Sequence, residues 1–174
     1  MSTDQKGNIA EAAVVLAAVK LGMDVYRPVG EGGRCDLILG IEHLLLRVQC
    51  KWAARYGNVV VVRCYSARRS AGGRLINRWY TTDEVDAFAA YSPDLDRCSL
   101  LPPALWADRR LVQLRIAPAR NKQTRRINWA DDFDFDARLI SLGAIAQLGE
   151  RLAGSQKGTG SSPVGSIPPG PPRS

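Results

Sequence analysis

Polar side chains that could act on a phosphate stand at both ends of an otherwise apolar stretch, DLILGIEHLLLRVQCK, residues 36–51. The stretch reads as two short strands joined by a turn. Alternate residues of a strand share a face, so Gln49 and Lys51 point to one side and Cys50 to the other. Asp36 begins the preceding strand and can lie beside them across the hairpin. A carboxylate, an amide oxygen and an ammonium group are therefore expected in one small cluster.

A second carboxylate is available from Glu11, which interrupts the apolar segment IAEAAVVLAAV. This segment is apolar on nearly all sides, which favours a buried helix. A carboxylate in such a helix is costly unless it is paired or bound to a cation. The alternative is an exposed acid near a helix N-terminus, where the helix dipole stabilises it.

The combined set suits the hydrolysis of a phosphodiester bond. Carboxylate oxygens of Glu11 and Asp36 can hold one or two magnesium ions, with a backbone carbonyl as a further ligand. Bound magnesium polarises a phosphate and acidifies the attacking water. Lys51 can orient that water and stabilise the developing charge. On spacing alone the alternative stays open that Asp36 only begins a strand, and that Gln49 and Lys51 lie on a solvated strand face.

The elements that must position these residues begin with a helix. Thr3 or Asp4 is expected to cap it, and it runs to about Leu21, where Gly22 ends it. A second helix is predicted over residues 81–91, because Thr81 and Glu84 have the spacing of a capping box.

Strands and loops account for most of the remaining residues. Apolar and β-branched runs predict strands at 24–29, 36–41, 44–51, 58–66 and 110–116. The segments between them read as a flexible loop at 30–34 and a basic loop at 66–74. The order α-β-β-β-β-α-β predicts an α/β (α+β) fold with a mixed central sheet flanked by helices, in one domain over residues 1–141.

Composition limits the class of protein. The chain has 174 residues, of which 45% are hydrophobic, enough for one domain with its own core. No apolar run is long enough to span a membrane, and no secretory signal is recognised, so a cytoplasmic protein is expected. The four cysteines are widely spaced and are expected to be reduced thiols in or near the core. The net charge of +7 favours a polyanionic partner, first of all nucleic acid.

Two groups of basic residues could grip such a partner. Both combine cations that bind phosphates with side chains that can read base edges. The alternative is a solvated charged surface. The candidates for nucleic-acid contact are Arg68, Arg69 and Arg74 in the first group, and Arg120, Lys122, Arg125 and Arg126 in the second.

Glu11, Asp36 and the triplet Gln49-Cys50-Lys51 resemble the motif of the PD-(D/E)XK nuclease superfamily. The surrounding text, KGNIAEAAVVLAAVKLGMDVYRPVGEGGRCDLILGIEHLLLRVQCKW, is similar to its homing-type endonucleases associated with group I introns, which are related in fold to Holliday junction resolvases. YTTDEVDAFAAYSPDLDRCSLLPP and LVQLRIAPARNKQ are similar to the same branch. The resemblance covers roughly residues 5–135 and implies a restriction-endonuclease-like core.

The resemblance also implies roles for the cluster. Glu11, Asp36, Gln49 and the backbone carbonyl of Cys50 would be ligands of Mg²⁺, and Lys51 would be the catalytic lysine. The substrate would be double-stranded DNA, cut by a dimer or tetramer. Gln49 departs from the superfamily pattern, which usually has an acid there, and an amide is a weaker ligand. The alternatives are a structure-specific nuclease acting on branched DNA, and an inactive nucleic-acid-binding module of the same fold.

The C-terminal segment, residues 142–174, is rich in Gly, Ser and Pro and has no aromatic residue. It is expected to be a disordered tail, because it has too little to bury. LGAIAQLGERLAGSQKGTGSSPVGSIPPG also resembles a translated tRNA gene, since AQLGER and GSSP can be encoded by sequences like a tRNA D-arm and T-arm. The hypothesis is that the reading frame runs into a neighbouring tRNA gene, which would suit a nuclease carried by a mobile element. The coding DNA tests it, because codons that form no cloverleaf would leave an ordinary disordered tail.

Overall fold

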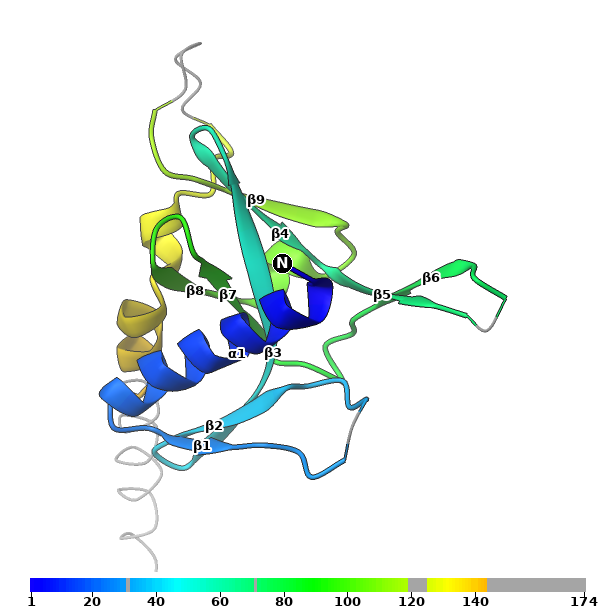
Figure 1. The fold of residues 1–174 in the computed structure, drawn as a ribbon. Helices are drawn as coiled ribbons and strands as arrows, with labels where there is room; N and C mark the ends of the chain where they lie inside the picture. Colours follow the sequence, from blue (N-terminus) through cyan, green and yellow to red (C-terminus); the bar gives the residue numbers. More distant parts are fainter. Residues whose placement is uncertain (31, 71, 119–124, 144–174) are drawn as a thin grey trace, which may run out of the picture.

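The fold is a strongly twisted sheet with helices on both faces, from which a separate two-stranded ribbon projects (Figure 1). The structure is a computed structural model and describes residues 1–30, 32–70, 72–118 and 125–143. Its elements are α1 Thr3–Lys20, β1 Asp24–Tyr26, β2 Leu37–Ile41, β3 Leu44–Tyr56, β4 Val59–Arg63, β5 Tyr65–Arg69, β6 Leu75–Trp79, β7 Ala87–Ser92, β8 Arg97–Leu101, α2 Pro103–Trp106, β9 Leu111–Arg115 and the 3₁₀-helix η1 Ala130–Phe133.

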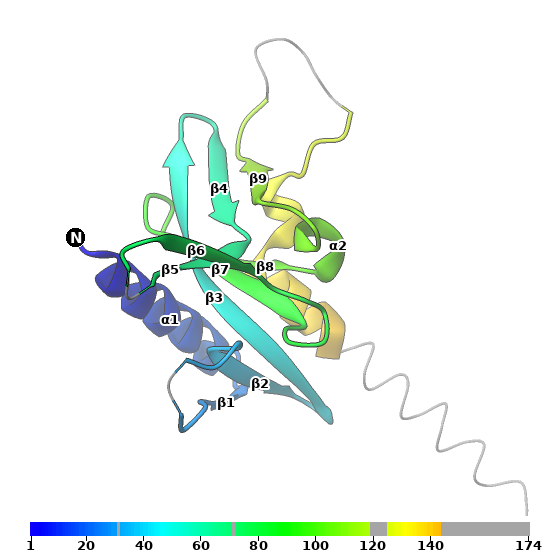
Figure 2. The same cartoon turned by 90° about the vertical axis from the view of Figure 1, so that its right-hand side faces the viewer.

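Among the described residues, the main sheet has seven strands, in the order β1-β2-β3-β4-β9, with β7 paired to β3 and β8 paired to β7. The pair β3–β7 is parallel and the others are antiparallel. The predicted mixed sheet flanked by helices is therefore confirmed. Figure 2 shows α1 and α2 on opposite sides of the sheet.

Strand β3 is the axis of the fold and changes its partner along its length. Its first part pairs with β2 as far as Val48, and its last part pairs with β4 from Ala53 onward. Between these pairings, residues 49–52 have β7 on one side, and no strand of the described part of the chain pairs with them on the other. At this gap in the middle of the sheet, the part of β3 that contains Gln49 and Lys51 has a strand partner on one side only.

Two hydrophobic clusters cover the two faces of the sheet. One contains Val14 and Ala18 of α1, and Leu139 from the helical residues 135–143. The other contains Trp106 of α2 and Phe133 of η1. Strand β7 contributes to both, because Ala87 and Ala89 face the first cluster while Phe88 and Ala90 face the second.

The helix predicted over residues 81–91 is wrong. The side chain of Glu84 accepts a hydrogen bond from the amide of Thr81, as in a capping box, but only a turn forms there. The chain then enters β7. The sequence AFAAYS becomes a strand because its alternate residues fill cores on both faces of the sheet, and this tertiary packing outweighs the local helix signal.

The strand predicted over 58–66 and the basic loop predicted over 66–74 also need correction. The main-sheet strand β4 ends at Arg63, and the buried Cys64 separates it from β5. Residues 65–69 and 75–79 form the antiparallel β5–β6 ribbon. The predicted loop is thus mostly a hairpin that projects from the body, clearly seen at the right of Figure 1.

Helix α1 differs from expectation in its cap and in its burial. Its N-cap is Ser2, which forms a capping box with Gln5, whereas Thr3 and Asp4 lie inside the helix. Gly22 follows its end with a positive φ of 73°, as the predicted stop requires. The helix is buried along one stripe only, because Leu16 and Val19 are each 56% exposed.

Other sequence-based expectations concern the termini and the cysteines. All four cysteines are free thiols, and Cys50 and Cys64 are buried. Within the described part of the chain, no helix is both long enough and apolar enough to cross a membrane. Residues 144–174, which make up nearly all of the predicted tail, lie outside the described residues.

Candidate active site

Asp36 is fixed against the middle of β3 by its backbone and its carboxylate. Its amide donates to the carbonyl of Val48 at 2.9 Å, which continues the β2–β3 ladder. Its Oδ2 accepts a hydrogen bond from the amide of Cys50 at 2.8 Å and another from the side-chain amide of Gln49. Both side-chain bonds end on Oδ2, so Oδ1 is the oxygen that could take a metal ion.

Gln49 lies in the gap of the sheet and is 8% exposed. Its Nε2 donates to Asp36 and, at 3.4 Å, to the carbonyl of Cys50. The structure thus gathers the carboxylate, the amide and the backbone carbonyl that were predicted to share a site.

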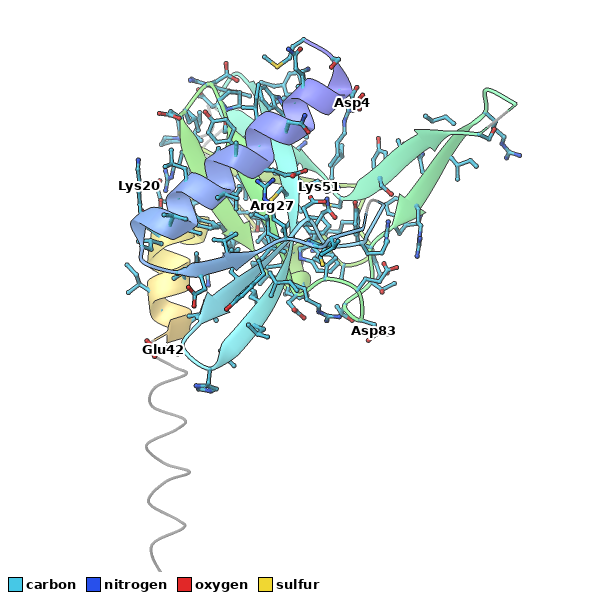
Figure 3. All side chains as sticks on the ribbon, turned by 60° about the horizontal axis from the view of Figure 1, so that its bottom comes forward. Asp4, Lys20, Arg27, Glu42, Lys51 and Asp83 are labelled. Atoms are coloured by element: carbon cyan, nitrogen blue, oxygen red, sulfur yellow. The ribbon has the colours of Figure 1, made fainter. Side chains whose placement is uncertain are left out.

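Glu11 approaches from α1, where it is half-buried. Burial raises the pKa of Glu11, the charge of Asp36 raises it further, and the charge of Arg27 opposes both. Burial is also the main cause that raises the pKa of Asp36. The two carboxylates are therefore close enough to repel each other. Figure 3 shows Arg27 and Lys51 beside the middle of α1, near the base of the ribbon.

Lys51 is half-buried, and its ammonium lies in a partly aromatic environment. Its Nζ donates to the hydroxyl of Tyr80 at 3.0 Å and lies 4.3 Å from the centre of the Tyr80 ring and 5.5 Å from that of Phe88. Burial lowers the pKa of Lys51 to about 8, although the charge of Asp36 works in the opposite direction. The ammonium form still predominates at neutral pH.

Tyr80 and its neighbour Arg34 are parts of the site that the sequence did not reveal. Tyr80 is 29 residues from Lys51 in the chain and directly follows β6, and no motif marks it. The guanidinium of Arg34 lies 4.0 Å from the centre of the Tyr80 ring. Arg34 belongs to the segment GEGGR, which reads as a flexible loop, so its packing against the ribbon could not be foreseen.

The donor set fits a hard divalent cation. Within the described residues, no three His, Cys, Asp or Glu side chains are gathered as a metal site. The available donors are the carboxylates of Glu11 and Asp36, the amide of Gln49 and the carbonyl of Cys50, and Mg²⁺ and Ca²⁺ prefer such oxygen ligands. A bound cation would also relieve the repulsion between Glu11 and Asp36.

The basic residues predicted to contact nucleic acid are distributed over two places. Arg68 and Arg69 lie in β5 and Arg74 is exposed near the tip of the ribbon. Arg125 and Arg126 are exposed beyond β9, whereas Arg120 and Lys122 lie outside the described residues. Next to β9 there is a basic hollow of about 330 Å³, lined by Arg109, Gln113, Arg115, Arg126 and Asn128 among others.

Replacing Asp36 by asparagine is expected to stabilise the fold at neutral pH. The folded-state pKa of Asp36 is raised above 3.8, so the stability that the neutral carboxyl contributes is present below about pH 3.8 and is lost as the pH rises through the folded pKa. At pH 7 the ionised carboxylate therefore destabilises the fold, and Asp36→Asn removes this effect. Tm should rise by roughly 2–4 °C for each kcal/mol by which the free energy of unfolding increases.

Thermal unfolding at several pH values measures this effect. The advantage of Asp36→Asn should shrink as the pH falls toward 3.8. Mg²⁺ should raise the Tm of the wild type more than that of the variant, because the variant has lost a ligand. Asp83→Asn is the control, since Asp83 is exposed and lies apart from Lys51 in Figure 3. A variant that is less stable than the wild type at pH 7 would contradict the prediction.

Comparison with known proteins agrees with the geometry. In the search of solved structures, the chain is similar to a bacterial homing endonuclease, I-Ssp6803I, with a TM-score of 0.67 and 25% sequence identity over 84% of this chain and 98% of that chain. The search of curated proteins gives no match. This similarity confirms the expected restriction-endonuclease-like core.

A scan against family models matches residues 1–136 to the PD-(D/E)XK endonuclease family. The match spans α1, β2 and β3, which carry Glu11, Asp36, Gln49 and Lys51, and continues through β9. The resemblance inferred from the motif residues is thereby confirmed, and the chain belongs to the PD-(D/E)XK endonuclease family.

Proposed function

We propose that the protein is a Mg²⁺-dependent endonuclease that hydrolyses phosphodiester bonds in double-stranded DNA. The observation that carries the proposal is the contact between Asp36 and Gln49 at the gap in the sheet, with the charges of Glu11 and Lys51 near enough to act on Asp36 or be acted on by it. The similarity to a homing endonuclease supports DNA as the substrate, and the net charge of +7 favours a polyanion.

Each residue of the cluster has a proposed role. Glu11, Asp36 Oδ1, Gln49 and the Cys50 carbonyl would hold the cation. When bound, the cation supplies Lewis-acid activation of the phosphate and a more acidic water. Lys51 places a positive charge on the same strand face, where it would stabilise negative charge that develops on the phosphate.

Cleavage of DNA tests the proposal directly. Supercoiled plasmid, and DNA that carries the tRNA locus suggested by the tail, are incubated with wild-type protein in Mg²⁺ or in EDTA. We expect nicked or linear product only in Mg²⁺, and none from Asp36→Asn at matched concentration. Equal amounts of product in EDTA and in Mg²⁺ would refute metal dependence. Equal amounts of product from Asp36→Asn and the wild type would show that Asp36 is not part of the active site.

Gln49 favours one other function, an inactive DNA-binding module of the same fold. Its amide Nε2 is directed at Asp36, and an amide is a neutral and weaker ligand than a carboxylate. The partly desolvated ammonium of Lys51 argues against this alternative, because an inactive protein gains nothing from desolvating it. Specific DNA binding without cleavage of either substrate would favour the module.

The basic hollow beside β9 is proposed to contact DNA phosphates. Arg109, Arg115 and Arg126 line it together, and their mutual repulsion makes a bound anion favourable. Arg115→Ala is expected to weaken DNA binding and to reduce the slope of log K against log [salt] by about 0.9 for each phosphate that the variant no longer neutralises. Titrations in Ca²⁺ at several salt concentrations measure the slope.

The control for the salt experiment is Lys20→Ala. It removes one exposed positive charge from the last turn of α1, and this end of the helix lies away from β9 in Figure 1. An unchanged slope for Arg115→Ala, or the same change for both variants, would show that the hollow makes no specific contact and that only net charge matters.

A homo-oligomer is proposed because cutting both strands requires two active sites. Helix α1 carries an exposed apolar stripe of Ile9, Leu16 and Val19, which a second copy of the chain could cover. Leu16→Glu is expected to shift the protein toward the monomer, as measured by light scattering after gel filtration. Asn8→Glu adds the same charge at an exposed polar position of the helix. An unchanged mass for Leu16→Glu would rule out the stripe as the interface.

The biological setting is proposed from the same similarity. A homing-type or element-borne nuclease would act on DNA in the cytoplasm of its host, where the free thiols of all four cysteines are also expected. If the coding DNA shows a tRNA gene beneath residues 142–174, the intact tRNA locus becomes the first target sequence to test.

A further inference from the structure

The hydroxyl of Tyr80 is bonded to the ammonium of Lys51, and we propose that Tyr80 is a positioning residue that holds Lys51 in its catalytic orientation. The inference rests on the proposed nuclease function. Tyr80 lies outside β2 and β3, which carry most of the family motif, and the β5–β6 ribbon that ends just before it brings it to Lys51. Tyr80 is not proposed to touch the substrate or the cation.

The contact is suited to fixing a lysine without neutralising it. The lysine side chain is long, and ordering it costs conformational entropy. The Tyr80 hydroxyl accepts at 3.0 Å, and the Tyr80 ring lies beside the same ammonium at 4.3 Å. Burial raises the pKa of Tyr80, so its oxygen stays neutral. A carboxylate in this place would cancel the charge that the phosphate needs, whereas a phenol leaves it available.

Tyr80 is itself held rigidly on its ring. The residue is 8% exposed and packs edge-on against Phe88, with ring centroids 5.2 Å apart. Phe88 pairs with Gln49 in the β3–β7 register, so the support for the ring comes from the strand next to the site. The guanidinium of Arg34 packs on the ring at 4.0 Å.

The backbone on both sides of Tyr80 is fastened by Arg34 and Glu84. Arg34 donates to the carbonyl of Trp79, the residue before Tyr80, and forms an ion pair with Glu84 at 3.0 Å. Glu84 in turn accepts from the amide of Thr81, the residue after Tyr80, at 3.2 Å. Such a clamp places the hydroxyl within narrow limits, as orientation of a catalytic group requires.

The test is Tyr80→Phe, which keeps the ring and its packing and removes only the hydroxyl. Single-turnover cleavage at saturating protein and Mg²⁺ is expected to slow by about 10-fold or more, because small displacements of catalytic groups are costly. DNA affinity in Ca²⁺ should stay at the wild-type value, and Tm should fall by a few degrees at most, because the Lys51 ammonium loses one acceptor. Tyr91→Phe is the matched control, since it removes a hydroxyl that donates to the exposed Asp96 at 2.9 Å, whereas the Tyr80 hydroxyl accepts from Lys51.

A double variant separates positioning from other roles. If Tyr80 acts through Lys51, adding Tyr80→Phe to Lys51→Met should cause no further loss in long incubations. An additional loss, an unchanged rate for Tyr80→Phe alone, or a lower Tm with an unchanged rate would each overturn the inference. If the wild-type protein leaves DNA intact, the proposed function fails, and this inference fails with it. If the wild type cleaves DNA and the Tyr80 variants give one of the contrary results, only the role of Tyr80 is refuted.

Discussion

Replacing Lys51 by methionine is expected to lower the rate of Mg²⁺-dependent cleavage by about 10²–10³-fold, the usual loss when one donor to a developing anion is removed. Methionine keeps most of the length of the aliphatic chain and removes the positive charge. Asp36, Gln49 and the backbone of β3 make none of their hydrogen bonds to the ammonium, so their arrangement should persist. Single-turnover cleavage measures the rate, and titration in Ca²⁺ measures DNA affinity separately.

The same substitution has an opposite effect on folding, which distinguishes loss of chemistry from loss of structure. Burial lowers the folded-state pKa of Lys51 to about 8 from 10.5. The unfolded chain therefore binds this proton more tightly, and the stability of the wild type relative to the variant rises between about pH 8 and pH 10.5. Below pH 8 the desolvated ammonium destabilises the folded state, so Lys51→Met should be at least as stable as the wild type at pH 7.

The control is Lys20→Met, which removes an exposed lysine at the C-terminal end of α1. It should cleave DNA at the wild-type rate. Cleavage by Lys51→Met within about threefold of the wild type would contradict the 10²-fold loss expected for a charge-stabilising group. A cooperative fold lost in Lys51→Met would instead indicate a structural role.

The local geometry around Asp36 and β3 could be predicted because strand periodicity decides which side chains share a face. Gln49 and Lys51 follow that period, and Asp36 needs only to begin the adjacent strand for its carboxylate to reach them. The place of Glu11 was a separate inference. It relied on a helix expected to be buried all round, and α1 is in fact buried along one stripe.

The residues around Lys51 could not be predicted, because they depend on contacts distant in sequence. Tyr80 reaches Lys51 only because the chain leaves the main sheet at Cys64, makes the ribbon and returns at Trp79. The basic composition of residues 66–74 suggested a loop, so the β5–β6 ribbon was not predicted. The spacing of Thr81 and Glu84 predicted a helix, whereas the structure has only a turn there. Whether AFAAYS forms a helix or a strand is decided by the two cores that it fills.

Truncating Trp106 to alanine is expected to lower the free energy of unfolding by about 3–5 kcal/mol, among the largest effects of a single core substitution. Trp106 is 1% exposed, and its ring stacks on Phe88 with centroids 4.5 Å apart. Its indole N–H donates to the carbonyl of Leu101 at 3.1 Å, so alanine leaves both a cavity and a buried acceptor without its partner. Urea unfolding followed by circular dichroism measures the loss.

This loss should also reach the active site, because Trp106 supports the ring against which Tyr80 packs. Phe88 lies between them, and Lys51 is 5.5 Å from the Phe88 ring. Trp106→Phe keeps an aromatic ring against Phe88 and should retain more stability and more cleavage than Trp106→Ala. Trp79→Ala is the control for removing an indole, since Trp79 is 47% exposed and its carbonyl, which Arg34 uses, remains. If Trp106→Ala lowers the free energy of unfolding no more than Trp79→Ala does, then α2 contributes little to the core. The structural support of Lys51 would then have to come from the β5–β6 ribbon alone.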